Sequence, residues 1–156
     1  MNILYAGFEG RNNSSKILLD TLNCNNKIYL KNDKHRSCEQ IETMLSTNSY
    51  DYVFLFGQKP IIKNKLSIEQ YAKKDNILES NLDIKALSKF FTSKNINNYI
   101  SHNAGTSYCN NIYHFTLNLI KEKKLNTKVI FIHIPYIKNF NNIKEVANLL
   151  MKGEIK

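Results

Sequence analysis

The sequence contains few residues of the kinds that define several specialised classes of chain. Its 156 residues include only five glycines, two prolines and three cysteines. So little glycine and proline excludes a collagen-like chain and a Pro/Gly-rich disordered chain, and so few cysteines exclude a disulfide scaffold. The odd cysteine number is typical of a reducing compartment, and we expect a cytoplasmic protein. The length and the 42% hydrophobic content predict one globular domain over residues 1–156.

Long hydrophobic segments are also absent. The longest apolar run, residues 129–137, is interrupted by His133 and Pro135, and it is far shorter than the roughly 20 residues that cross a bilayer. The first eight residues lack the basic and apolar regions of a signal peptide. We therefore expect no membrane partner.

Arginine is scarce although the chain is basic. Lysine and arginine number 22 against 13 acidic residues, a formal net charge of +9, yet the arginines are only Arg11 and Arg36. A charge of this size can indicate a nucleic-acid partner. However, the lysines are spread over the whole chain, and arginine is the residue that reads bases through paired hydrogen bonds. We interpret the lysines as solvated surface and predict no nucleic-acid partner, with nucleic-acid binding as an alternative.

Short apolar runs alternate with amphipathic stretches. The runs are mostly rich in Ile, Val, Tyr and Phe, which predicts strands at residues 2–6, 27–30, 51–56, 98–101 and 128–134. Apolar stripes with helical spacing predict helices at residues 14–22, 37–45, 82–91, 111–120 and 143–151. This alternation favours an α/β fold, a three-layer α/β/α sandwich with a mostly parallel sheet. In such a sheet the site usually forms at the carboxyl ends of the strands.

A cysteine and a histidine are expected at that edge of the sheet. Cys109 lies in a polar run just before the helix predicted at 111, and a helix N-terminus lowers the pKa of a thiol and can hold an oxyanion. His133 stands near the end of the last predicted strand, which Pro135 terminates. Together they favour a nucleophile and its base. Taken singly, Cys109 is more simply interpreted as a small buried hydrophobe and His133 as a core histidine.

A third group should hold the imidazole in its working tautomer, and carboxylates near predicted strand ends and loops are few. They are Glu9, Asp51, Glu69 and Asp75. Of these, Glu69 is the one set within a short, mostly apolar segment, residues 66–72. A surface glutamate is the simplest interpretation of it from the residues alone.

Five segments of the chain carry a resemblance to a known family. They are residues 1–9 (MNILYAGFE), 57–58 (GQ), 68–72 (IEQYA), 104–110 (AGTSYCN) and 131–136 (FIHIPY). In order and approximate spacing they resemble pyroglutamyl peptidase I, also called pyrrolidone-carboxylate peptidase. The runs at 104–110 and 131–136 are the specific ones, whereas the shorter segments would be weak alone.

This resemblance implies a cytoplasmic α/β cysteine peptidase that removes an N-terminal pyroglutamyl residue from peptides. The expected substrate is a small peptide with a blocked N-terminus. The resemblance implies that Cys109 is the nucleophile, His133 the general base and acid, and Glu69 the orienting carboxylate. It implies no metal or cofactor, and it makes a homo-oligomer an expectation.

The resemblance also extends to substrate contacts. It implies that Gln58 contacts the substrate lactam and that Phe8 lies near the pocket. Tyr108 is a further candidate for substrate binding, although it could equally cover the sheet edge.

The chain departs from the family pattern around the pocket. Residues 10–14 (GRNNS) replace a Pro-Phe-Gly-Gly run, residues 59–61 (KPI) replace Gly-Gly-Arg, and Gln70 replaces an arginine. The chain is also shortened between Asn76 and Leu82. Two alternatives to pyroglutamyl specificity therefore remain: a thiol amidase for another small acyl group, and a catalytically impaired protein that acts as a binding module.

Overall fold

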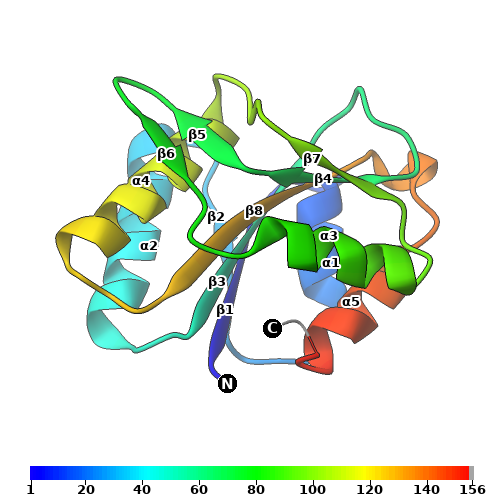
Figure 1. Ribbon diagram of the computed structural model, residues 1–156, viewed down its shortest axis with the longest axis horizontal. Helices are drawn as coiled ribbons and strands as arrows, with labels where there is room; N and C mark the ends of the chain where they lie inside the picture. Colours follow the sequence, from blue (N-terminus) through cyan, green and yellow to red (C-terminus); the bar gives the residue numbers. More distant parts are fainter. Residues whose placement is uncertain (155–156) are drawn as a thin grey trace.

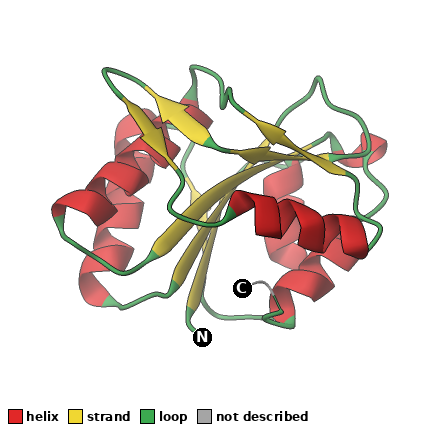
Figure 2. Ribbon diagram, viewed as in Figure 1, coloured by secondary structure: helices red, strands yellow, loops and turns green. Residues whose placement is uncertain are grey.

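One six-stranded sheet forms the centre of the computed structural model, which describes residues 1–154 (Figures 1 and 2). The predicted domain's last two residues lie outside that range. The strands are β1 (Ile3–Phe8), β2 (Lys27–Leu30), β3 (Tyr52–Gln58), β4 (Leu66–Glu69), β7 (Asn98–Ser101) and β8 (Lys128–Ile134), in the order β2-β1-β3-β8-β4-β7. Every neighbouring pair is parallel except β4 and β8, which are antiparallel. The mostly parallel sheet predicted from the sequence is therefore confirmed.

Helices cover both faces of this sheet. They are α1 (Ser14–Thr21), α2 (Lys34–Thr47), α3 (Ile84–Ser93), α4 (Tyr108–Glu122) and α5 (Ile143–Met151), with a short 3₁₀ helix η1 (Ile137–Asn139). In Figure 1, α2 and α4 lie to the left of the sheet and α1, α3 and α5 to its right. Two clusters of buried apolar side chains fill the spaces between the layers. The predicted three-layer sandwich is confirmed, and no helix within residues 1–154 has the length and apolar character needed to cross a membrane.

A small hairpin lies beside α4 and apart from the main sheet. Its strands, β5 (Tyr71–Lys73) and β6 (Ile77–Glu79), pair antiparallel. Of its two strands, only β6 lies between Asn76 and Leu82, where the resemblance implies a shortened segment. Neither this hairpin nor β4 was predicted from the sequence, because the strands of the hairpin are only three residues long and polar Ser67 and Glu69 interrupt the apolar residues of β4.

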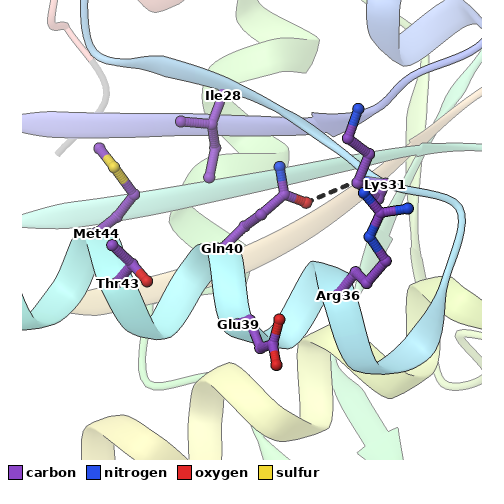
Figure 3. Close-up of a pocket in the computed structure, with 7 residues that line it drawn as sticks. All are labelled: Ile28, Lys31, Arg36, Glu39, Gln40, Thr43 and Met44. Atoms are coloured by element: carbon purple, nitrogen blue, oxygen red, sulfur yellow. Dashed lines mark hydrogen bonds between the residues drawn. The ribbon is translucent and has the colours of Figure 1, made fainter.

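The free edge of β2 is covered by a side chain of α2. Gln40 donates from Nε2 to the Tyr29 carbonyl (2.9 Å) and accepts at Oε1 from the Lys31 backbone N–H (2.8 Å), the bond drawn in Figure 3. This amide occupies positions that a further parallel strand would use. A cavity of about 440 Å³ adjoins it, lined by Ile28, Lys31, Arg36, Glu39, Gln40, Thr43 and Met44. The edge is thus closed to strand addition at these two residues.

Candidate active site

Cys109 is the second residue of α4, which begins at Tyr108. The preceding Ser107 has extended backbone, and its side chain makes no capping hydrogen bond. The first backbone N–H groups of a helix have no partner within the helix, so the thiol lies beside donors that can receive an oxyanion. The expected position of Cys109 at a helix N-terminus is confirmed. The helix starts three residues before the predicted 111 because its first turn is polar and lacks the apolar period.

The thiol packs directly on the sheet at Gly57 of β3. A Cβ atom added to Gly57 would lie 2.5 Å from Cys109 Sγ and 2.8 Å from Cζ of Phe131, so no larger residue fits without displacing them. Gly57 is the register partner of His133 on β8. The Cys109 thiol therefore lies against Gly57, which is next to His133 on the adjacent strand.

His133 and Glu69 form a buried pair. Nδ1 of His133 lies 2.7 Å from Oε1 of Glu69, and the hydroxyl of Ser67 donates to the same oxygen at 2.7 Å. The antiparallel register places Ser67 opposite His133, and Glu69, two residues further along β4, faces the same side. Glu69 is 0% exposed and His133 4%. The interpretation of Glu69 as a surface residue was therefore wrong.

The pKa values of Glu69 and Cys109 are shifted in opposite directions. Burial alone would raise the pKa of Glu69, but the hydrogen bond of His133, together with that of the Ser67 hydroxyl, holds this pKa below its usual value. Burial raises the pKa of Cys109 to about 12, the charge of Glu69 adds to this rise, and Lys59 opposes it. The expectation of a lowered thiol pKa was wrong, because the thiol is desolvated and lies near the charge of Glu69. The resting thiol keeps its proton and needs a base to remove it.

The ionised state of Glu69 also determines which ring nitrogen of His133 carries the proton. An ionised carboxylate only accepts hydrogen bonds, so Nδ1 of His133 is the protonated nitrogen. The neutral ring then carries its lone pair on Nε2. His133 is thereby prepared to accept a proton at the nitrogen that does not contact Glu69.

Lys59 is a site residue that the sequence analysis noted only as a departure from the family pattern. It directly follows β3, and its Nζ lies 3.3 Å from Glu69 Oε1, 3.5 Å from the Ser67 hydroxyl and 3.3 Å from the Asn103 carbonyl. The only sequence signal for the contact between Lys59 and Glu69 is the position of Lys59 directly after the Gly57-Gln58 pair. Gln70, in contrast, donates to Oε1 of Glu79 on the hairpin.

The first turn of α4 is tied to the neighbouring elements. Asn110 accepts from the backbone N–H of Lys73 (2.9 Å) and donates to its carbonyl (2.8 Å), as a paired strand would. The hydroxyl of Tyr113 donates to the Glu69 carbonyl at 2.8 Å. These bonds fix the position of α4 relative to β4 and the hairpin, and therefore the position of Cys109.

The three expected substrate contacts lie in two places. Phe8 is buried, and its ring lies 6.1 Å from that of Tyr108, which is 38% exposed at the start of α4. Gln58 instead points toward α1, where Oε1 accepts from the backbone N–H and the hydroxyl of Ser14, both at 3.0 Å. A cavity of about 640 Å³ adjoins Gln58, and its lining is Gly10, Arg11, Asn12, Asn13, Gln58, Tyr136, Ile137 and Lys138. Within residues 1–154 no group of three or more His, Cys, Asp or Glu could hold a metal ion.

A thiol at a helix N-terminus together with a carboxylate-bound histidine on an α/β sheet is typical of cysteine hydrolases. The family profile described as pyroglutamyl peptidase matches residues 75–149. The pyrrolidone-carboxylate peptidase of Thermosipho melanesiensis is 30% identical over 182 residues, covering 96% of this chain and 89% of that protein. That of Fusobacterium nucleatum is 30% identical over 125 residues, covering 65% and 58%. The chain belongs to the pyroglutamyl peptidase family, and it is an enzyme of the cysteine peptidase class.

Solved structures agree on the fold. Pyroglutamyl peptidase I of Bacillus amyloliquefaciens superposes with a TM-score of 0.86 at 15% identity, covering 98% of this chain and 94% of that one. A mutant pyrrolidone carboxyl peptidase (A199P) of Pyrococcus furiosus gives 0.81 at 20% identity and covers both chains completely. The family assignment and the architecture are therefore consistent.

Proposed function

We propose that this protein removes an N-terminal pyroglutamyl group from small peptides by cysteine acyl transfer. The observation that carries the proposal is the 2.7 Å contact between His133 Nδ1 and Glu69 Oε1, beside a thiol held at a helix N-terminus. A buried carboxylate that orients a histidine supplies the base that a protonated thiol needs. Membership of the pyroglutamyl peptidase family supports the choice of acyl group.

In the proposed reaction, His133 Nε2 takes the proton of Cys109 as Sγ attacks the pyroglutamyl carbonyl carbon. The carbonyl oxygen becomes an oxyanion, which the backbone N–H groups at the start of α4 stabilise. Collapse of this intermediate breaks the C–N bond, and His133 gives its proton to the leaving amine. Water then attacks the thioester with His133 as base, which releases pyroglutamate and restores the thiol.

The acyl group would bind beside the first turn of α4. Phe8 and Tyr108 supply an aromatic wall there, and most small-molecule sites combine such walls with a few placed polar groups. The backbone N–H and the hydroxyl of Ser14 donate hydrogen bonds to Oε1 of Gln58, and these bonds fix the side-chain amide of Gln58. Gln58 thus lies apart from this aromatic wall, and its proposed contact with the lactam oxygen requires its side chain to turn away from Ser14.

A thiol amidase for a different small acyl group is a second candidate. The observation that favours it is the presence of Arg11 and Lys138 in the cavity beside Gln58. Two cations there would suit an acyl group with a free carboxylate better than a neutral lactam.

A panel of coumarin amides tests both candidates. The purified protein is assayed with the pyroglutamyl, prolyl, N-acetylalanyl and glutaryl amides of 7-amino-4-methylcoumarin. Preference for the pyroglutamyl amide over the prolyl amide, which lacks the lactam oxygen, supports the proposed function. Preference for the glutaryl amide supports the second candidate. Failure to hydrolyse any of the four contradicts both and leaves a binding module.

Replacement of Gly57 by alanine tests the position of the thiol. The added methyl group would overlap Cys109 Sγ and the Phe131 ring, so one of them must move. A displacement of about 1 Å at a reacting atom can cost on the order of 100-fold in rate. We expect kcat/KM for the preferred amide to fall by about that factor, and the free energy of unfolding to fall by about 1–3 kcal/mol.

Gly7→Ala is the matched control for that change. A Cβ at Gly7 on β1 would lie 3.2 Å from Leu19 and Ser15, which are part of α1, and none of its nearest neighbours is the thiol. This variant should lose stability in urea unfolding and keep its activity. Wild-type activity in both variants would show that hydrolysis does not depend on the packing of the thiol against Gly57.

A further inference from the structure

We propose that Lys59 is a positioning residue whose charge balances the buried Cys109–His133–Glu69 group when the thiol proton moves to the imidazole. The proposal rests on the proposed function for the roles of those three residues. It assigns a role to a residue outside the segments of the family resemblance. It also makes a prediction about the thiol itself that does not depend on any substrate.

The geometry places the ammonium group of Lys59 inside the site. Its Nζ contacts the same carboxylate oxygen as Nδ1 of His133, at 3.3 Å against 2.7 Å. The Lys59 side chain is 19% exposed and the Glu69 side chain 0%. The backbone N–H of Lys59 donates to the Ile134 carbonyl at 2.9 Å, which anchors the residue beside the end of β8. Lys59 is therefore held between the ends of two strands rather than extended into solvent.

A count of charges shows why the site needs this cation. After proton transfer, the thiolate and Glu69 each carry one negative charge and the imidazolium carries one positive charge. Without Lys59 the buried group would hold a net charge of −1, and an uncompensated buried charge is costly. With Lys59 the sum is zero. The same sums hold in the resting state, in which Glu69 alone of the three is charged, so Lys59 keeps the buried group neutral before and after the proton transfer.

Because the net charge is the same before and after proton transfer, the effect of Lys59 depends on where each charge lies. In both states Lys59 and His133 face the same oxygen of Glu69, and proton transfer adds a positive charge at His133 and a second negative charge at Cys109. The negative charge of Glu69 opposes this ionisation, whereas the positive charge of Lys59 promotes it. The effect of Lys59 is consequently on the ease of forming the thiolate, in addition to holding Glu69 in place.

No other cation near this site replaces Lys59 among residues 1–154. The ion pairs to Glu69 come from Lys59 and His133, and His133 is itself the base. Lys65 Nζ stands over the Tyr99 ring at 4.7 Å, and Lys59 Nζ lies 5.9 Å from the same ring. Lys65 thus shares a neighbour with Lys59 but forms no ion pair with the carboxylate, which makes it a matched control.

The test measures alkylation of Cys109 by iodoacetamide, followed by mass spectrometry of its peptide, at several pH values between 7 and 9. Thiolate is the reactive species, and a rise of one unit in the thiol pKa lowers the rate about tenfold. We expect Lys59→Met to slow alkylation about tenfold at each pH. Lys59→Arg should restore the rate to within about threefold, because it returns the charge. Lys65→Met should leave the rate unchanged.

The hydrolysis assay separates this inference from the proposed function. For the preferred amide, we expect Lys59→Met to lower kcat about tenfold with little change in KM, since Lys59 does not contact the acyl group. A slower alkylation without any hydrolysis in the wild-type protein would support Lys59 and contradict the proposed function. Alkylation of Lys59→Met at the rate of Lys65→Met would overturn the role of Lys59. Should Lys59→Met fail to fold, Lys59→Gln, which keeps a donor for Asn103, carries the same test.

Discussion

Replacing Cys109 by alanine is expected to lower hydrolysis of the pyroglutamyl amide by at least about four orders of magnitude. The thiol supplies the atom that forms the acyl-enzyme, and no other described side chain beside His133 offers a nucleophile of that kind. The substitution removes one atom from a site packed against Gly57 and Phe131. The free energy of unfolding should therefore change by less than about 1 kcal/mol. Activity and urea unfolding, measured on the same preparation, check both statements.

Cys38→Ala is the control for this change. Cys38 lies on α2, its Sγ is 3.5 Å from Nδ2 of Asn111, and burial raises the pKa of its thiol. It thus resembles Cys109 in being a half-buried free cysteine, but it has no carboxylate-bound histidine next to it. Cys38→Ala should retain wild-type kcat/KM. Retained hydrolysis in Cys109→Ala would rule out the acyl-transfer mechanism, whatever the fold.

Regular elements with strong apolar patterns were predictable from the sequence. The strands at 27–30, 98–101 and 128–134 and the helix at 143–151 have the predicted bounds. β4 was missed for a physical reason, since its Ser67 and Glu69 point into the site and break the pattern of a buried strand. The antiparallel pairing of β4 with β8 depends on the path that the chain takes between β3 and β4, and no local sequence pattern encodes that path.

The site was predictable only in part. Cys109 and His133 were placed at one edge of the sheet because Cys109 follows a recognisable strand, His133 lies near the end of another, and parallel strands end at one edge. The buried contact between His133 and Glu69 depends on the register between β8 and β4, which a sequence does not display. The direction of the thiol pKa depends on how much of Sγ is desolvated, and Lys59 reaches Glu69 from a third strand. These are tertiary properties, and the sequence analysis had no means of deriving them.

Replacing Glu69 by glutamine is expected to lower kcat by about three orders of magnitude with little change in KM. Glutamine has nearly the same shape but cannot stabilise the imidazolium that forms when His133 takes the thiol proton. Its amide also offers hydrogens to the Lys59 ammonium and the Ser67 hydroxyl, where the carboxylate accepts from both. The imidazole would then lose its fixed tautomer as well as its counter-charge. Steady-state kinetics with the preferred amide measure the split between kcat and KM.

Glu79→Gln is the matched control, because Glu79 is an exposed carboxylate at the end of β6 that accepts from Gln70. It makes the same chemical change outside the site and should leave kcat unchanged. A similar loss of activity in both variants would show that the effect comes from the hairpin rather than from the buried carboxylate.

The same variant gives a pH-dependent signature in unfolding. The pKa of Glu69 is lowered in the folded protein, so its contribution to stability is fully present above the unfolded-state value of about 4.3 and is lost as the pH falls through the folded-state value. Glu69→Gln lacks this contribution at every pH. The difference in free energy of unfolding between wild type and variant should therefore shrink as the pH falls below about 4. A difference that stays constant from pH 7 to pH 3 would mean that the carboxylate is not held ionised by His133, and the orienting role assigned to Glu69 would then have no electrostatic basis.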